Sequence, residues 1–333
     1  MSQRDTSLDY LKGILILLVV YGHCIYWLNG KVNSYDYYFI AKIIYTFHMP
    51  LFIFISGYFF STKKNDNLCF TIFEKIKRLI IPHCFFNITM IIPIFCFWEI
   101  YGHFITRFSN GVITISSIYH YLTMFWFLWC VFFSCIITNI VYIFTSNKKK
   151  GNHVLILISI LFLLISQSHI IHILIDHQRM GTMFLFFALG VIFHDCISII
   201  SLKPTKYCAL IIYTIYITYI YFYPEKEHLI ITEIGNMSGV ICSYNLFRYF
   251  FILQWGLNYF LYVSKWTLSI YIYHFVILYA IMKYANTYYD NCNSAFVITT
   301  NLFIAVSVTY LISYITDLLS KSAFLRKYAF GGK

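Results

Sequence analysis

Long apolar segments recur along almost the whole chain, and they constrain its fold more than any other feature. The first, LDYLKGILILLVVYGHCIYWLNG at residues 8–30, is long enough to cross a bilayer, which needs about 20 apolar residues. Hydrophobic residues make up 60% of the 333 residues and charged residues 11%, against roughly 25% charged residues in soluble domains. This composition predicts an integral membrane protein without a separate soluble domain.

Ten segments have the length and polarity of membrane-spanning helices. In lipid the backbone must satisfy its hydrogen bonds within its own segment, and barrel strands would be shorter and alternating. The predicted helices cover residues 9–29, 38–60, 79–100, 119–144, 153–175, 182–201, 206–223, 237–257, 266–284 and 295–318. We therefore expect an all-α fold, a polytopic membrane helical bundle of about ten transmembrane helices that forms one domain over residues 1–333.

The distribution of Lys and Arg predicts the orientation of this bundle. With the N-terminus inside, 17 of the 24 Lys and Arg residues fall on the cytoplasmic side, six fall outside and Arg248 lies within a span. Cytoplasmic loops carry such an excess of positive charge. Both termini are therefore predicted to be cytoplasmic. The first apolar run has no small-residue cleavage site after it, so it is predicted to be an uncleaved span and not a signal peptide.

The net charge of +11 and the ten cysteines also exclude some functions. In a soluble protein such a charge would suggest nucleic acid, but here the cations lie in short loops between spans, where membrane topology explains them. The cysteines are scattered and no pair has the spacing C-x-x-C. This argues against a disulfide framework and against a metal cluster.

Three polar residues of the first span share one side of the predicted helix. Lys12 lies about 300° and His23 about 320° around the helix from Asp9, and His23 is roughly 21 Å from Asp9 along the axis. Ionisable groups within spans usually face the bundle interior or a wet cavity. His23 is therefore either part of a functional lining or a packing residue that bonds to a neighbouring helix.

Other polar residues lie within later spans. His48 is in FHMPLFIFISGYFF at residues 47–60, and His274 is in SKWTLSIYIYHFVIL at residues 264–278, close to the Tyr271 hydroxyl. A mid-membrane histidine suggests an internal cavity, although His48 also fits an interfacial decoration. Arg248 in the eighth span needs a partner or water, or snorkels toward the cytoplasm.

A basic segment precedes the third span. In EKIKRLIIP, residues 74–82, Lys75 and Arg78 are three residues apart and would share one face of a short amphipathic helix, with Lys77 beside them. Such a cluster either binds anionic lipid headgroups and sets topology or holds the phosphates of a polyanionic cofactor.

Five of these stretches, in this order, resemble the acyltransferase-3 family of membrane acyltransferases, in particular its fucose 4-O-acetylase-like group. They are RDTSLDYLKGILILLVVYGH, HMPLFIFISGYFF, EKIKRLIIP, WFLWCVFF and LSIYIYHFVIL. Lys12 and Lys75 stand where many members have arginine. Lysine keeps the positive charge but loses the bidentate fork, so the change affects the geometry of cofactor binding more than the class of protein.

The resemblance implies an O-acetyltransferase that moves an acetyl group from cytoplasmic acetyl-CoA to a hydroxyl of a cell-surface glycan or its lipid-linked precursor. It implies that His23 is a general base or a transient acyl carrier, since imidazole titrates near neutral pH. The expected catalytic residues are His23, Asp9, His48 and His274; the expected cofactor-binding residues are Lys12, Lys75, Lys77 and Arg78; the expected substrate-binding residues are Trp126, Tyr271 and Arg248. No metal is expected.

Two other classes share a Tyr- and Phe-rich bundle with few buried charges, namely a lipid-linked oligosaccharide flippase and a glycan polymerase. The absence of a pseudo-repeat disfavours the first, and outer loops of at most about 18 residues disfavour the second. The Ile-, Tyr-, Asn- and Lys-rich composition is typical of a bacterial inner-membrane protein, whose partners would be the bilayer and the glycan acceptor.

Overall fold

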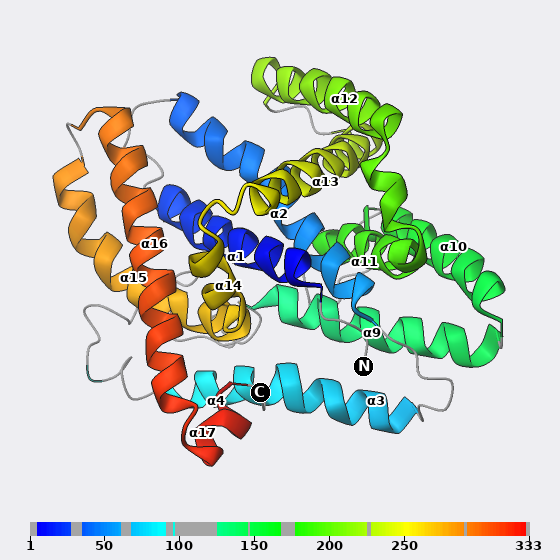
Figure 1. Ribbon diagram of the computed structural model, residues 1–333, viewed down its shortest axis with the longest axis horizontal. Helices are drawn as coiled ribbons and strands as arrows, with labels where there is room; N and C mark the ends of the chain where they lie inside the picture. Colours follow the sequence, from blue (N-terminus) through cyan, green and yellow to red (C-terminus); the bar gives the residue numbers. More distant parts are fainter. Residues whose placement is uncertain are drawn as a thin grey trace.

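The computed structural model describes residues 5–27, 35–60, 68–90, 96, 125–145, 147–167, 177–224, 228–289 and 292–330. These residues form helices joined by turns (Figure 1), which confirms the predicted all-α class. The main helices are α1 (Thr6–Trp27), α2 (Tyr35–Tyr58), α3 (Leu68–Lys75), α4 (Ile81–Thr89), α9 (Trp126–Thr145), α10 (Lys148–Gln167), α11 (His177–Ile192), α12 (Lys203–Phe222), α13 (Leu229–Ile252), α14 (Leu257–Ser264), α15 (Thr267–Tyr289), α16 (Ser294–Leu319) and α17 (Ala323–Tyr328).

Six of the described helices are long and apolar enough to cross a membrane. They contain Thr6–Tyr26, Tyr37–Tyr58, Trp126–Thr145, Lys148–Ser166, Thr267–Ala285 and Ser294–Leu319. A shorter apolar helix covers Arg179–Ile192. The count of ten spans and the cytoplasmic location of both termini stay predictions.

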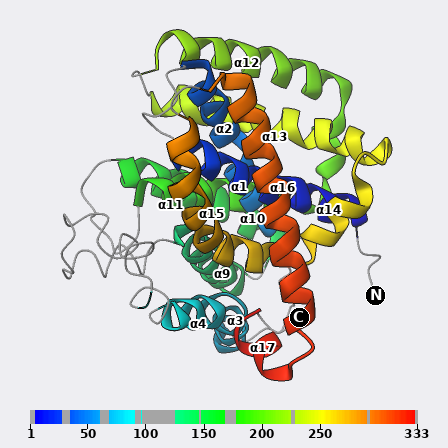
Figure 2. The same cartoon turned by 90° about the vertical axis from the view of Figure 1, so that its left-hand side faces the viewer.

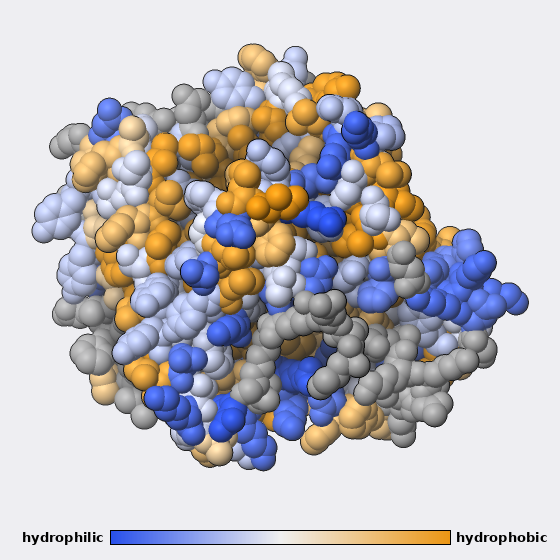
Figure 3. All heavy atoms as spheres, viewed as in Figure 1, coloured by the Kyte–Doolittle hydropathy of each residue, from blue (hydrophilic) through white to orange (hydrophobic). Residues whose placement is uncertain are grey.

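The surface of the bundle is strongly apolar. Leu157 of α10 is 68% exposed, Ile215 of α12 is 64% exposed and Phe303 of α16 is 72% exposed. Figure 3 shows hydrophobic side chains over much of one face, whereas hydrophilic side chains gather at the turn between α9 and α10, where Lys148–Lys150 are exposed. Such apolar exposure is unusual in a soluble monomer and is what lipid-facing helices require.

Helix α1 lies in the middle of the molecule in both ribbon views (Figures 1 and 2). It packs against α2, α13, α14, α15 and α16. Gly13 permits the contact with α14, because a Cβ atom at this position would overlap the carbonyl group of Phe260. The central position explains why an apolar helix can carry polar residues at both ends, since neighbouring helices cover them.

Helices α2 and α11 approach each other through two glycines. A Cβ atom at Gly57 would overlap the carbonyl of Phe187, and a Cβ atom at Gly190 would overlap the carbonyl of Phe54. Small residues let helix backbones come close in membranes, where van der Waals packing drives association. This reciprocal contact holds α11 directly against α2.

The third predicted helix, 79–100, differs from the structure. One helical run begins at Leu68, passes through a π-helical turn, η1 (Ile76–Ile80), and ends at Thr89 (Figure 1). The predicted boundary at residue 79 is therefore wrong, because the amphipathic segment and the start of the apolar segment form one continuous rod. Residues 91–95 and 97–100, like 28–29, 119–124 and 168–175 of other predicted helices, lie outside the described residues.

Two later predicted boundaries were also wrong. The helix predicted at 182–201 ends at Ile192, followed by two 3-10 turns, η2 (Phe193–Asp195) and η3 (Ile197–Ser201); Pro204 then occupies the first turn of α12, where its missing N–H costs nothing. The helix predicted at 237–257 covers Leu229–Ile252, and its first turns can include the polar Glu233 because this carboxylate receives a 2.6 Å hydrogen bond from Thr182 of α11.

Candidate active site

Two imidazole rings meet where α1 packs against α15. The ring centroids of His23 and His274 are 5.3 Å apart, and the ring of Phe275 lies 4.7 Å from that of His23. His23 is half-buried and His274 is fully buried. Paired histidines from separate helices can pass a proton between them, which a lone packing histidine cannot do.

The hydrogen bonds of His274 define its tautomer. Its Nδ1 atom lies 2.8 Å from the carbonyl oxygen of Ile270. Because a carbonyl only accepts hydrogen bonds, Nδ1 must carry the proton, and Nε2 of the neutral ring is then an acceptor. Nε2 is buried and has no hydrogen-bond partner in the part of the chain that the structure describes. A buried acceptor without a partner is costly, and such atoms often serve a reacting or bound group.

His48 approaches the same region through Tyr45. Its Nδ1 lies 2.7 Å from the carbonyl oxygen of Ile44, so this ring too has Nδ1 protonated. The ring of Tyr45 is perpendicular to that of His48, with centroids 4.8 Å apart. A Cβ atom at Gly22 would lie 3.3 Å from the Tyr45 ring, so this tyrosine packs against α1 directly beside His23.

An aromatic wall extends from His274 to the start of α9. The ring of Tyr271 is 6.1 Å from that of His274 and 5.5 Å from that of Phe127. The neighbouring Trp126 faces a cation, because the guanidinium carbon of Arg179 lies 5.5 Å from its ring centroid. Two predicted substrate-binding residues, Trp126 and Tyr271, thus lie on the side of the bundle that carries His274.

Arg179 is a residue of this region that the sequence did not single out. Besides Trp126, it lies close enough to the hydroxyls of Tyr45 and Tyr271 to act on both electrostatically. In the sequence it resembled an ordinary loop cation before an apolar helix. Only its position at the start of α11, a helix that packs on α2 and α9, brings its charge to the histidines' aromatic neighbours.

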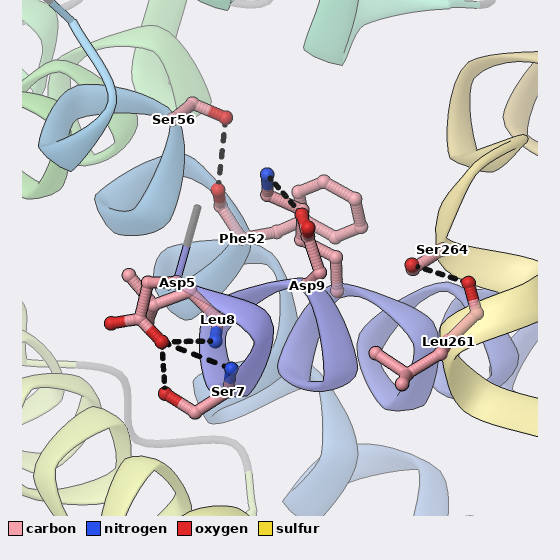
Figure 4. Close-up of polar contacts among 9 residues, drawn as sticks. Asp5, Ser7, Leu8, Asp9, Phe52, Ser56, Leu261 and Ser264 are labelled. Carbon is pink, nitrogen blue, oxygen red and sulfur yellow. Dashed lines mark hydrogen bonds and ion pairs between the residues drawn. The ribbon is translucent and has the colours of Figure 1, made fainter. Parts of the chain in front are cut away.

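The opposite end of α1 holds the predicted carboxylate and lysine. Lys12 Nζ lies 3.4 Å from Asp9 Oδ1 and 3.9 Å from the ring centroid of Phe59. Figure 4 shows Asp9 between α2, near Phe52 and Ser56, and α14, near Leu261 and Ser264. Asp9 is buried, so the pair lies within the bundle and not on its rim.

The segment that carries the predicted phosphate-binding residues Lys75, Lys77 and Arg78 is not a regular α-helix. The π-turn at Ile76–Ile80 follows Lys75 and contains Lys77 and Arg78, and its wider turn changes which side chains share a face. Lys75 lies 5.8 Å from the ring centroid of Phe60 and contacts Cys135 of α9. Arg78 is largely exposed and lies 3.5 Å from Glu74. Lys75 thus contacts Phe60 and α9, whereas Arg78 is open to a ligand from outside.

Comparison with known proteins decides the family. The acyltransferase-3 family model, described as an acyltransferase domain, matches residues 5–318. The chain belongs to the acyltransferase-3 family. The match runs from the start of α1 to the end of α16, so every predicted site residue falls within the acyltransferase domain.

Two curated relatives of this acyltransferase-3 protein are nodulation proteins NolL. The one from Sinorhizobium fredii (strain NBRC 101917 / NGR234) is 31% identical over 152 residues, which are 44% of this chain and 39% of that protein. The one from Mesorhizobium japonicum (strain LMG 29417 / CECT 9101 / MAFF 303099) is 32% identical over 145 residues, 42% of this chain and 36% of that protein. The alignments thus span well under half of either relative. No solved structure matches the chain.

Arg248, a predicted substrate-binding residue of this acyltransferase-3 chain, lies in a third place, apart from both the histidines and the Asp9–Lys12 pair. Its Nη1 atom lies 3.5 Å from the Ser201 hydroxyl, in a pocket between α12 and α13. No contact with the histidines is found for it. Among the described residues, no group of three or more His, Cys, Asp or Glu side chains could hold a metal ion.

Proposed function

We propose that this acyltransferase-3 protein is a membrane O-acetyltransferase of the bacterial inner membrane. It moves an acetyl group from cytoplasmic acetyl-CoA to a hydroxyl of a cell-surface polysaccharide or lipid-linked glycan. The observation that carries the proposal is the apposition of His23 and His274, 5.3 Å between ring centroids, within a chain whose family model is an acyltransferase domain.

The proposed chemistry is attack of the acceptor hydroxyl on the thioester carbonyl. The hydroxyl oxygen forms a bond to the acetyl carbon, the carbon–sulfur bond breaks, and coenzyme A leaves as a thiolate that then takes up a proton. An imidazole removes the hydroxyl proton during the attack. In the alternative route His23 first carries the acetyl group and then gives it to the acceptor.

His274 positions His23 in this scheme. If an N–H of His23 is directed at Nε2 of His274, which is a buried acceptor, the other nitrogen of His23 keeps its lone pair for the acceptor hydroxyl. A base oriented by a third group is the recurring arrangement of nucleophile activation in unrelated enzymes. The bond from His274 Nδ1 to Ile270, 2.8 Å long, keeps the ring of His274 in the tautomer that this role requires.

The donor enters from the Asp9 end of α1 in this proposal. Along the helix axis Asp9 lies roughly 21 Å and Lys12 roughly 16 Å from His23. Lys75, Lys77 and Arg78 would hold the phosphates of coenzyme A by charge-assisted hydrogen bonds. The reactive end of the donor would then extend along α1 toward the histidines.

The acceptor occupies the aromatic wall on the other side. Trp126 offers a half-buried indole ring to a sugar, and the guanidinium of Arg179 lies 5.5 Å from its centroid. The guanidinium also adds the positive charge that the negatively charged oxygen of the tetrahedral intermediate needs. Tyr45 and Tyr271 supply hydroxyls that orient the sugar.

Transfer of label tests the proposal. Membranes that contain the chain receive radiolabelled acetyl-CoA and a cell-surface glycan preparation, and base-labile label on the glycan is counted. We expect transfer by the wild type, loss by His23→Ala, and wild-type transfer by His153→Ala, since His153 is exposed on α10. Absence of transfer by the wild type would overturn the activity, and full transfer by His23→Ala at equal protein level would overturn the role of His23.

A further inference from the structure

A second site lies apart from the histidines, where η3, α12 and α13 meet. A pocket of about 310 Å³ is lined there by Ser201, Lys206, Asn245, Arg248, Tyr249 and Ile252. It belongs to the part of the bundle that α12 and α13 form together, at the top of Figure 1. None of the steps proposed for acetyl transfer uses it.

Hydrogen bonds make the walls of this pocket a defined structure. Asn245 Nδ2 donates to the carbonyl oxygens of Ile200, at 3.0 Å, and of Ile241, at 2.8 Å, and thereby ties η3 to α13. Arg248 Nη1 lies 3.5 Å from the Ser201 hydroxyl and also contacts the Tyr244 hydroxyl. The guanidinium is therefore held at the pocket and does not swing freely in solvent.

Two cations and no carboxylate among the described residues line the pocket, and a nearby acidic group, Asp5, acts on the neighbouring Tyr244 hydroxyl without forming an ion pair with either cation. Within the described residues the ion pairs are those of Lys12 with Asp9 and of Arg78 with Glu74, and neither Lys206 nor Arg248 has one. Two like charges at a common pocket repel each other, so an anion between them lowers the energy. Arginine, lysine and a hydroxyl together are the donors that proteins use to hold phosphate groups.

The outer rim of the pocket is apolar. Tyr249 is 56% exposed and Ile252 is 68% exposed, and Leu202 and Leu253 beside them are exposed too. On a membrane protein, exposed apolar side chains of this kind are suited to contact with lipid chains. A ligand that fits both features has a phosphate head group and a hydrocarbon part.

We propose that this pocket binds the phosphate group of a membrane lipid through Lys206, Arg248 and Ser201. The inference stands on the pocket alone and does not depend on the proposed acetyl transfer. The shared chemistry, a phosphate group, also occurs in soluble compounds, and the experiment below separates the two sources.

Native mass spectrometry of the full chain in detergent tests the site. The probe is dioleoylphosphatidic acid, and dioleoylglycerol serves as the same lipid without phosphate. We expect the wild type to retain phosphatidic acid but not dioleoylglycerol, and Lys206→Gln/Arg248→Gln to lower its apparent affinity at least about tenfold, because hydrogen bonds between charged groups are lost. The control Lys203→Gln/Lys321→Gln changes the net charge equally at two exposed lysines and should bind as the wild type does.

Three further outcomes decide the interpretation. If Lys206→Gln/Arg248→Gln binds phosphatidic acid as tightly as the wild type, the proposed site is wrong. If the control variant loses as much affinity as Lys206→Gln/Arg248→Gln, the lipid is bound by diffuse surface charge and not by this pocket. Lys206→Arg/Arg248→Lys should retain binding, and its failure would overturn the role of the two charges. If millimolar inorganic phosphate displaces the lipid, the ligand of the pocket is a soluble phosphate compound and not a membrane lipid. If it does not displace the lipid, the result supports a membrane lipid as the ligand.

Discussion

His23 of α1 and His274 of α15 lie with their ring centroids 5.3 Å apart, one ring half-buried and the other fully buried. The tautomer of His274 leaves its Nε2 as an acceptor without a partner among the described residues. In our proposal this relationship makes two polar residues, each of which alone suits helix packing, a pair that holds and moves a proton.

The first prediction concerns His274. Asparagine at this position can still donate to the Ile270 carbonyl but offers nothing in place of Nε2, so His274→Asn should lower kcat about 100-fold, within the range for acid–base groups. The KM for acetyl-CoA should stay within about twofold, because His274 does not touch the donor phosphates in our scheme. Initial rates of label transfer at varied acetyl-CoA check both values.

His153→Asn on the exposed surface of α10 is the matched control. A parallel rise in KM, or an unchanged kcat, would show that His274 serves packing and does not position His23.

The second prediction concerns Arg179 and Trp126. Arg179→Lys keeps the charge but loses the planar group that stacks on the indole, a contact worth about 0.5–1 kcal/mol at exposed sites. We expect the KM for the glycan acceptor to rise about threefold and the KM for acetyl-CoA to stay unchanged. Trp126→Leu should have a similar effect, and the double variant should add little to either single one.

Arg326→Lys, at an exposed position of α17, is the control for this series. Fully additive effects of Arg179→Lys and Trp126→Leu would mean that the two residues act independently, contrary to the stacked geometry.

The third prediction concerns the donor side. Lys75→Gln and Arg78→Gln should each raise the KM for acetyl-CoA about tenfold, since a charge-assisted hydrogen bond is worth about 1.5–3 kcal/mol, with little change in kcat. Acetyl-CoA without its 3′-phosphate shows which of the two residues contacts that phosphate. A variant that has lost this contact should no longer discriminate between the donors with and without the 3′-phosphate.

Lys149→Gln, an exposed lysine at the start of α10, controls for general charge. If Lys75→Gln and Arg78→Gln both keep the wild-type KM for acetyl-CoA, the coenzyme A phosphates bind elsewhere. The two cations would then serve to set the membrane topology.

The fourth prediction concerns stability. Gly190→Ala pushes a methyl group into the backbone carbonyl of Phe54, which cannot move without separating α11 from α2. Overpacking of this kind costs about 1–3 kcal/mol. Gly22→Ala meets only the side chain of Tyr45, at 3.3 Å, and should cost less. Thermal unfolding of the two purified variants in detergent compares them, and equal midpoints would contradict the close helix contact.

The class of fold and the family can be predicted from the amino-acid sequence alone, because both rest on local information. A run such as residues 8–30 is helical in a membrane whatever its neighbours are, and the motifs around His23, His48 and His274 lie within single helices. The sequence also placed the starts and ends of several helices to within a few residues, as for α1, α12 and α16.

Which residues contact one another could not be predicted in this way, because it depends on how the helices pack. Arg179 joins Trp126 because α11 packs against α9, and Glu233 is tolerated in α13 because Thr182 of another helix bonds to it. The π-turn after Lys75 changes the helical register of Lys77 and Arg78 relative to Lys75. These features depend on contacts between helices distant in the chain, and a periodic apolar pattern specifies which side of a helix is buried but not the partner it is buried against.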